Sequence, residues 1–146
     1  MTHLAGPSVI DASAVMPVIA TEPCSAVAGR WFTAAQRHLA SSVTVDLFDP
    51  ECASAVWKRV QWSRWSLEDA ETALGRVLEL PFPRVAFRDL AGEALRVALR
   101  FEITTDDAFY IALAMASHLP LVTADRRMAR AARQAGCKVV CFAEQS

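Results

Sequence analysis

The sequence predicts an α/β fold in which helices cover both faces of a central parallel sheet. Short apolar runs alternate with longer segments in which apolar residues recur at helical spacing. This alternation is typical of parallel strands joined by helical crossovers. The chain has 146 residues, of which 53% are hydrophobic and 21% charged, as in one globular domain. We therefore expect residues 1–146 to form a single three-layer α/β/α domain with a sheet of four to five strands.

Four apolar runs are predicted to form strands. The first, in the segment SVIDASAV, ends at Asp11, and the second, SVTVDLF, ends near Phe48. The third, LPLVT, covers residues 119–123, and the last, CKVVCF, covers residues 137–142. Ligands of such sheets bind outside the carboxyl ends of the strands, so residues that follow these runs are the first candidates for function.

Five helices are predicted between or after these strands. Asp49 followed by Pro50 is typical of an N-cap with proline at the first helical position, so one helix is expected to begin at about Pro50. Ser66 is expected to cap the next helix, which the segment PFP closes. The apolar spacing predicts three further helices, over residues 90–101, over residues 108–115 and in RRMARAARQAG, which Gly136 stops.

The overall charge argues against a strongly basic nucleic-acid-binding protein. The formal net charge is −1, from 15 basic and 16 acidic residues. A net charge near zero does not exclude a local basic surface, because 13 of the 15 basic residues are arginines and several of them are clustered. A nucleic-acid contact is therefore expected from one face of the protein only.

The cysteines and the apolar segments indicate a cytoplasmic protein. The cysteines form no Cys-x-x-Cys pair, so we expect buried thiols instead of a zinc site or disulfides. No Lys or Arg precedes Arg30, and Asp11 and Pro17 interrupt the N-terminal apolar run, which argues against a signal peptide. The segment IALAMASHLPLV is shorter than the ~20 residues of a membrane span, so no membrane association is expected.

Four carboxylates are predicted to meet at the carboxyl edge of the sheet. Asp11 and Asp125 follow predicted strands, whereas Glu51 and Asp107 fall in the first turns of predicted helices. One interpretation is that each acid caps a helix or opposes its dipole. The other is that all four form one cluster, which is costly unless a cation neutralises it. Oxygen donors without His or Cys favour Mg²⁺ or Mn²⁺, which leave sites for phosphate oxygens and activated water.

Four segments in order resemble the PIN-domain family, specifically the VapC-type ribonuclease toxins of toxin–antitoxin pairs. The segments are VIDASAV, DLFDPECASAVWKRV, TTDDAFYIALA and LVTADRRM, and together they span nearly the whole chain. The resemblance implies a compact α/β/α fold with a parallel sheet. It also implies an acidic cluster that binds Mg²⁺ or Mn²⁺ and cleaves RNA, and a small antitoxin protein as partner.

The resemblance also implies roles for individual residues. The family's catalytic, metal-binding acids fall on Asp11, Glu51, Asp107 and Asp125. Asp107 is preferred to Asp106 because it precedes AFYIALA at the family's distance. The hydroxyl residues of the first and last segments fall on Ser13 and Thr123, which are implied to orient the carboxylates. Some relatives carry a further acid after the last aspartate, whereas arginines follow here, so no fifth ligand is expected.

Two groups of basic and aromatic residues offer surfaces for partners. Arg126, Arg130 and Arg133 share a helix face, which is either solvated or binds RNA phosphates beside the metal. The segment WKRVQWSRWS carries Trp57, Trp62 and Trp65 among basic residues. Base stacking is one interpretation of these tryptophans, but we favour core packing or a protein interface. The resemblance supports an interface, because helices of this region in relatives help form the dimer and receive the antitoxin.

The leading hypothesis is a Mg²⁺-dependent endoribonuclease of the VapC type that is neutralised by an antitoxin. A homodimer is expected because apolar helix faces in a chain this rich in Ala, Leu and Trp need cover. One alternative is an RNA-processing nuclease outside a toxin–antitoxin pair, and another is a catalytically silent PIN-like binding module, against which the presence of all four acids argues. A phosphoacceptor receiver domain is disfavoured, because its late lysine would be Lys138, which opens a strand.

Overall fold

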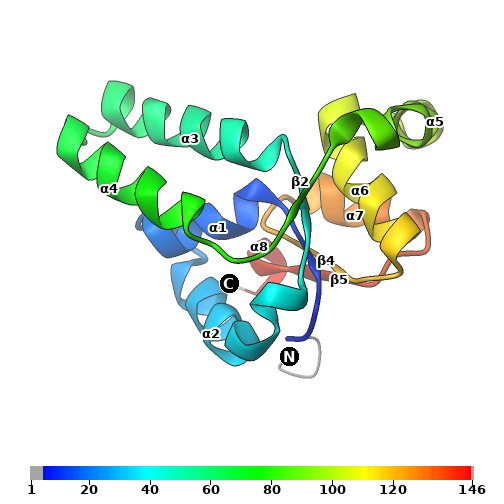
Figure 1. The fold of residues 1–146 in the computed structure, drawn as a ribbon, viewed down its shortest axis with the longest axis horizontal. Coiled ribbons are helices and arrows are strands. Elements are labelled where there is room, and N and C mark those ends of the chain that lie inside the picture. Colours follow the sequence, from blue (N-terminus) through cyan, green and yellow to red (C-terminus); the bar gives the residue numbers. More distant parts are fainter. Residues whose placement is uncertain (1–4, 146) are drawn as a thin grey trace.

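The strands at the centre of the molecule are short and parallel. A computed structural model of the protein describes residues 5–145. The strands β1 (Val9–Ile10), β4 (Leu121–Thr123) and β5 (Val139–Cys141) form one sheet in the order β1-β4-β5, and β2 (Thr44–Val45) pairs with β3 (Arg84–Val85) (Figure 1). A parallel bridge between Val9 and Val43 joins the two parts. The predicted parallel sheet is confirmed, as a three-stranded and a two-stranded part.

Helices make up most of the remaining chain. The α-helices are α1 (Ala12–Ile19), α2 (Ser25–Ala35), α3 (Phe48–Trp62), α4 (Leu67–Leu78), α5 (Ala91–Phe101), α6 (Thr105–Ser117), α7 (Arg126–Gln134) and α8 (Phe142–Gln145). Two 3₁₀-helices, Gln36–Ser41 and Phe87–Leu90, follow α2 and precede α5. All five predicted helices are present, as α3 to α7.

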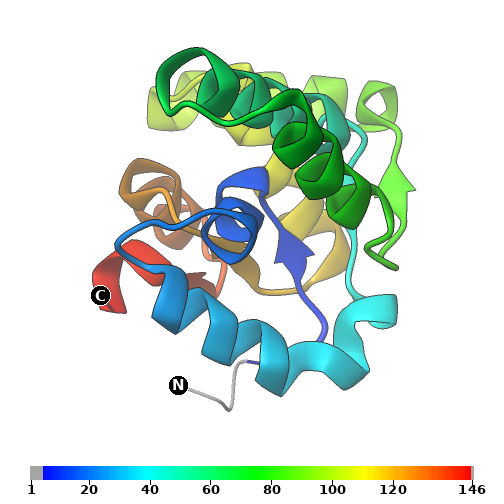
Figure 2. The ribbon, with the colours of Figure 1, turned by 90° about the vertical axis from the view of Figure 1, so that its left-hand side faces the viewer.

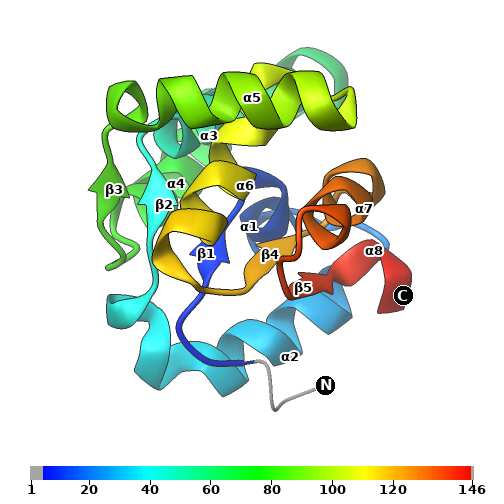
Figure 3. The ribbon, with the colours of Figure 1, turned by 90° about the vertical axis from the view of Figure 1, so that its right-hand side faces the viewer.

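The core has two halves, one on each face of the sheet, because successive side chains along a strand point to opposite faces. Ile10 and Val122 pack against α1 and α2, whereas Val9 and Leu121 pack against α5, α6 and α7. Successive side chains of a strand point to opposite faces, so each of these short strands contributes to both halves. Figure 2 shows the side covered by α1 and α2, and Figure 3 shows the side covered by α5, α6 and α7. The predicted three-layer α/β/α architecture is confirmed.

Three helices are absent from the sequence-based prediction: α1, α2 and the four-residue α8. β1 ends at Ile10, and α1 begins two residues later. The sequence of α1, ASAVMPVI, is buried at five of its eight positions, so apolar residues surround the helix and hide its period. In α2, the buried residues stand at the helical spacing i, i+3 and i+7, a signal that the prediction missed: Ala28, Trp31 and Ala35.

The start of α3 differs from the prediction, whereas the start of α4 agrees with it. α3 begins at Phe48, so Asp49 lies in the first turn and the predicted N-cap at Asp49 is wrong. The Asp49 carboxylate accepts two hydrogen bonds from the guanidinium of Arg84, at 2.9 and 3.1 Å. Ser66 does cap α4, because its hydroxyl accepts the N–H of Asp69 in a capping box.

The cysteines are free thiols, and three of the four are buried as expected. Cys24, Cys52 and Cys141 are buried, Cys137 is half-buried, and all four thiols are free. Cys137 lies before β5, so the prediction that the last strand begins there is wrong. Within residues 5–145, no helix is long and apolar enough to cross a membrane.

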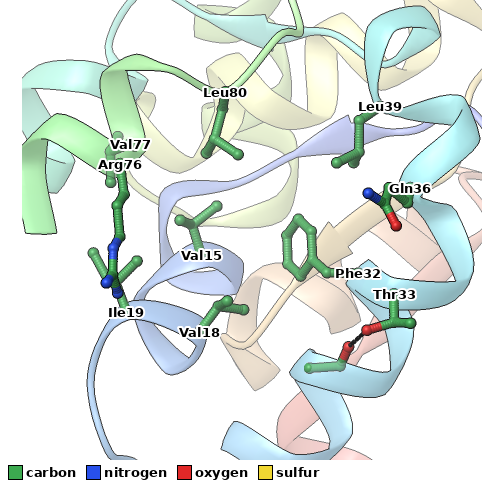
Figure 4. Close-up of a pocket in the computed structure, with 11 residues that line it drawn as sticks. Val15, Val18, Ile19, Phe32, Thr33, Gln36, Leu39, Arg76, Val77 and Leu80 are labelled. Carbon is green, nitrogen blue, oxygen red and sulfur yellow. Dashed lines mark hydrogen bonds between the residues drawn. The ribbon is translucent and has the colours of Figure 1, made fainter.

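An apolar cavity of about 430 Å³ lies where α1, α2 and α4 meet. Val15, Phe32 and Leu80 line it, and Arg76 is the one charged residue of its lining (Figure 4). Its lining residues include no Asp or Glu, so this cavity is separate from the carboxylates that the sequence singles out.

Candidate active site

The four predicted acids lie at the N-terminal ends of four different helices, at the carboxyl edge of the sheet. Asp11 links β1 to α1, and Asp125 links β4 to α7, while Glu51 and Asp107 lie in the first turns of α3 and α6. Figure 3 shows α1, α6 and α7 around β1 and β4. The acids are close enough to act on one another, since Asp11 and Asp107 raise the pKa of Glu51, and Asp125 raises that of Asp107. These interactions link the charges of all four acids across the sheet edge.

Asp11 is the most deeply buried of these acids, with 2% of its surface exposed. Its carboxylate accepts hydrogen bonds from the hydroxyls of Ser13 and Thr123, the latter at 2.7 Å. Burial raises the pKa of Asp11 to about 6, and the two hydroxyls oppose that rise. The side chain does not cap α1, so the capping interpretation is wrong for Asp11.

Ser13 and Thr123 connect the ends of the two neighbouring strands. Their hydroxyl oxygens lie 3.1 Å apart. The backbone N–H of Ala124 donates to the Ser13 hydroxyl at 2.9 Å, and that of Asp125 donates to the Thr123 hydroxyl at 3.0 Å. These contacts hold the Asp11 carboxylate against the loop that leads into α7, as expected of groups that orient a ligand.

Asp125 caps α7 as well as facing the other acids. One oxygen, Oδ1, accepts the backbone N–H groups of Arg127 and Met128 at 2.8 and 3.2 Å. The capping interpretation is thus confirmed for Asp125. A capped carboxylate is held rigidly by the helix, and its charge still acts on Asp107.

Glu51 forms a hydrogen bond to the fully buried Tyr110 of α6. The Tyr110 hydroxyl donates to Oε1 of Glu51 at 2.7 Å. The pKa of Glu51 is raised to about 7, first by burial and then by the neighbouring carboxylates, although the Tyr110 hydrogen bond opposes the rise. A carboxyl group in this range gains and loses a proton near neutral pH.

The adjacent acids Asp106 and Asp107 differ in burial. Asp107 is half-buried, and burial together with Asp125 raises its pKa. Asp106 is exposed, although its charge also acts on Glu51 and Asp107. This difference supports the choice of Asp107 as the residue that faces the cluster.

The cluster offers only oxygen donors. Within residues 5–145, no three His, Cys, Asp or Glu side chains already converge as a ligand set for a metal ion. The chemistry of the four acids nevertheless fits a hard divalent cation, because three of them have raised pKa values and a cation would relieve the repulsion. Asp11, Glu51, Asp107 and Asp125 are the residues that would hold Mg²⁺ or Mn²⁺.

The three arginines predicted to bind RNA lie on the exposed face of α7, near the C-terminal helix. The guanidinium of Arg126 donates to the carbonyl oxygen of Ala143 at 2.6 Å. Arg133 forms two hydrogen bonds of 2.7 Å with the Glu144 carboxylate, and this pairing lowers the pKa of Glu144. Arg130 is exposed and also acts on Glu144. One arginine of this face, Arg133, is therefore already paired with a carboxylate of the same chain, that of Glu144.

Comparison with known proteins identifies the family. A PIN-domain family model matches residues 8–134. The chain belongs to the PIN-domain family. The PIN domain is 30% identical over 125 residues to Ribonuclease VapC3 of Mycobacterium tuberculosis strains CDC 1551 and H37Rv, covering 84% of this chain and 85% of that protein. It is similar to the crystal structure of PAE2754 from Pyrobaculum aerophilum, with a TM-score of 0.70 and 29% identity over 93% of this chain and 85% of that one.

Sequence reasoning missed one residue of the PIN-domain site. Tyr110 touches Glu51, yet in the sequence it stands in an apolar helical segment and looks like a core residue. A signal was present, because Tyr110 follows Asp107 by three residues and so shares its helix face. Buried tyrosine hydroxyls usually have a partner, and Glu51 is the partner here.

Two of the three tryptophans in WKRVQWSRWS lie on the surface and not in the core. Trp57 and Trp62 on α3 are 55% and 71% exposed, and their rings meet edge to face with centroids 5.7 Å apart. Trp65 is half-buried beside the contact between α3 and α4. Core packing is therefore wrong for Trp57 and Trp62, which leaves a protein interface or base stacking.

Proposed function

We propose that this PIN domain is a Mg²⁺- or Mn²⁺-dependent endoribonuclease of the VapC type. The observation that supports it most is the mutual electrostatic repulsion of four carboxylates at the N-terminal ends of four helices, with the pKa values of Asp11, Glu51 and Asp107 all raised. Such a cluster favours a divalent cation. The similarity to Ribonuclease VapC3 favours RNA as the substrate.

The chain's own residues have distinct roles in this proposal. When bound by the four acids, the cation supplies charge neutralisation at the scissile phosphate and a more acidic water. Ser13 and Thr123 keep the Asp11 carboxylate in place, and α7 keeps Asp125 in place. Glu51 would serve as a further oxygen ligand or position the water, and the Tyr110 hydroxyl orients its carboxylate.

The arginine face of α7 would hold the RNA backbone. Arg126, Arg130 and Arg133 begin next to Asp125 and follow the exposed side of the helix. Guanidinium groups bind phosphates through charge-assisted hydrogen bonds. RNA phosphates would replace the Glu144 carboxylate as the partner of Arg133, which is an exchange of one anion for another.

The same proposal includes two protein partners, a small antitoxin and a second copy of the chain. Exposed apolar side chains on α3 and α5 support a homodimer, because such groups are usually covered: Trp57, Trp62, Leu95 and Leu99. The antitoxin would occupy the tryptophan-bearing region and reach the acidic edge, where an arginine side chain would compete with the cation.

Incubation of the purified protein with total RNA, followed by mapping of the cleaved ends, tests the nuclease proposal. We expect cleavage with Mg²⁺, none with EDTA, and none from the Asp11→Asn variant. Cleavage that persists in the variant and in EDTA would contradict the proposal. Growth arrest on expression and co-purification of a small protein test the toxin role, whereas harmless expression of an active nuclease would indicate RNA processing.

A further inference from the structure

Tyr110 joins two helices of the site through its hydroxyl group. The side chain is fully buried, and its hydroxyl donates to Oε1 of Glu51 at 2.7 Å, between residues 59 positions apart in the chain. Tyr110 also lies one helical turn after Asp107 on α6. A single side chain thus connects the helix that carries Asp107 to the helix that carries Glu51.

The hydrogen bond has a fixed direction. A tyrosine phenol ionises only at about pH 10, so it is protonated at neutral pH. A protonated phenol beside a carboxylate can only donate to it. Tyr110 therefore acts as a permanent donor to Glu51 and not as a base.

This donor restrains the Glu51 side chain. Among residues 5–145, Tyr110 is the one side chain that forms a hydrogen bond with the Glu51 carboxylate. A glutamate has more rotatable bonds than an aspartate, so an unrestrained Glu51 would sample several positions. The bond occupies Oε1 and leaves Oε2 as the oxygen available to a cation or a water molecule.

We infer that Tyr110 is a positioning residue that holds Glu51 in the orientation from which it binds the divalent cation. The inference rests on the proposed metal site. It gives Glu51 the same kind of support that Ser13 and Thr123 give Asp11, since hydroxyl donors around a ligand fix its orientation. Tyr110 itself would not touch the cation or the RNA.

Mn²⁺ binding, measured by calorimetry or by the electron paramagnetic resonance of the free ion, tests this inference without RNA. The variants are Tyr110→Phe, Glu51→Gln and the double variant, each with a melting temperature. Ser117→Ala is the matched control, because it removes another hydroxyl from α6, one that donates to the Leu113 carbonyl oxygen. We expect Tyr110→Phe to weaken Mn²⁺ binding on the order of tenfold while the protein stays folded.

The double variant separates positioning from a general structural effect. If Tyr110 acts through Glu51, adding Tyr110→Phe to Glu51→Gln lowers Mn²⁺ affinity no further. Unchanged affinity in Tyr110→Phe, or an equal loss with and without Glu51, would overturn the inference. Absence of Mn²⁺ binding by the wild-type protein would overturn the inference and the metal site together, whereas a Mn²⁺-binding protein that cuts no RNA would overturn the nuclease proposal alone.

Discussion

Thr123 donates its hydroxyl proton to the Asp11 carboxylate at 2.7 Å, across 112 residues of the chain. Asp11 directly follows β1, and Thr123 is the last residue of the neighbouring parallel strand β4. The same Thr123 oxygen accepts the N–H of Asp125, so one buried hydroxyl fixes two of the four acids. Strand pairing thus determines the geometry of the acidic edge before any cation binds.

Replacing Thr123 with valine tests this connection. The side chains are similar in shape, so Thr123→Val removes the hydroxyl and little else. We expect the free energy of unfolding to fall by about 1–3 kcal/mol, because a buried hydrogen bond to a carboxylate is lost. We also expect RNA cleavage to fall by roughly 10- to 100-fold, measured on a defined RNA. Thr33→Val is the control, since its hydroxyl donates to the carbonyl of Gly29 on exposed α2; equal losses in both variants would contradict a specific role for Thr123.

The pH dependence of stability without metal reports on Asp11. Its pKa in the folded protein is about 6, against an ordinary value of 3.8, so the folded state favours the protonated acid. The contribution of Asp11 to the free energy of unfolding is therefore largest below about pH 4 and is lost as the pH rises to about 6. This change amounts to about 3 kcal/mol at most. Glu51 contributes in the same direction up to about pH 7.

Denaturant unfolding in EDTA at several pH values measures this loss. Asp11→Asn carries no ionisable group at this position, so it should be more stable than the wild type at neutral pH and should lose less stability as the pH rises. Mn²⁺ should restore stability to the wild type at neutral pH and have a smaller effect on the variant. A wild type and a variant with the same pH dependence would show that the Asp11 carboxyl is not strained by burial.

The sequence predicted the positions of the acids better than the length of the strands. Asp11 and Asp125 follow apolar runs and could be placed at one edge from topology alone. β3 covers only two residues and is defined by pairing with β2, which no local pattern reveals. The partners of Tyr110 and Arg84 could not be assigned from the sequence, because these partners, Glu51 and Asp49, lie far away in the chain. Contacts of this kind appear only when the fold brings the partners together.

Substitution of each adjacent aspartate tests which one belongs to the site. Asp107 is half-buried beside the charge of Asp125, whereas Asp106 is exposed. We expect Asp107→Asn to abolish Mg²⁺-dependent cleavage, and Asp106→Asn to lower it by less than about tenfold, through the loss of a nearby charge. Cleavage assays on one RNA with both variants check this, and equal losses would show that Asp106 shares the role of Asp107.

The arginine face of α7 gives the last prediction. If Arg126, Arg130 and Arg133 contact phosphates, changing all three to glutamine should weaken RNA binding and flatten its salt dependence by roughly 0.7 in the log–log slope for each lost single-strand contact. Binding measured at several salt concentrations, with Ca²⁺ in place of Mg²⁺ to slow cleavage, gives the slope. An unchanged slope would mean that these side chains are only a solvated face.

Glu144 provides the matched variant for the same assay. Its carboxylate holds Arg133 through two hydrogen bonds of 2.7 Å, so RNA has to displace it. Glu144→Gln keeps the side-chain shape but removes the competing charge, and we expect RNA to bind several-fold more tightly with an equal or steeper salt dependence. Weaker binding would instead show that the Arg133–Glu144 pair organises the surface that RNA contacts. The two variants are expected to act in opposite directions, because the first removes three positive charges from α7 and the second removes the negative charge that pairs with one of them, Arg133.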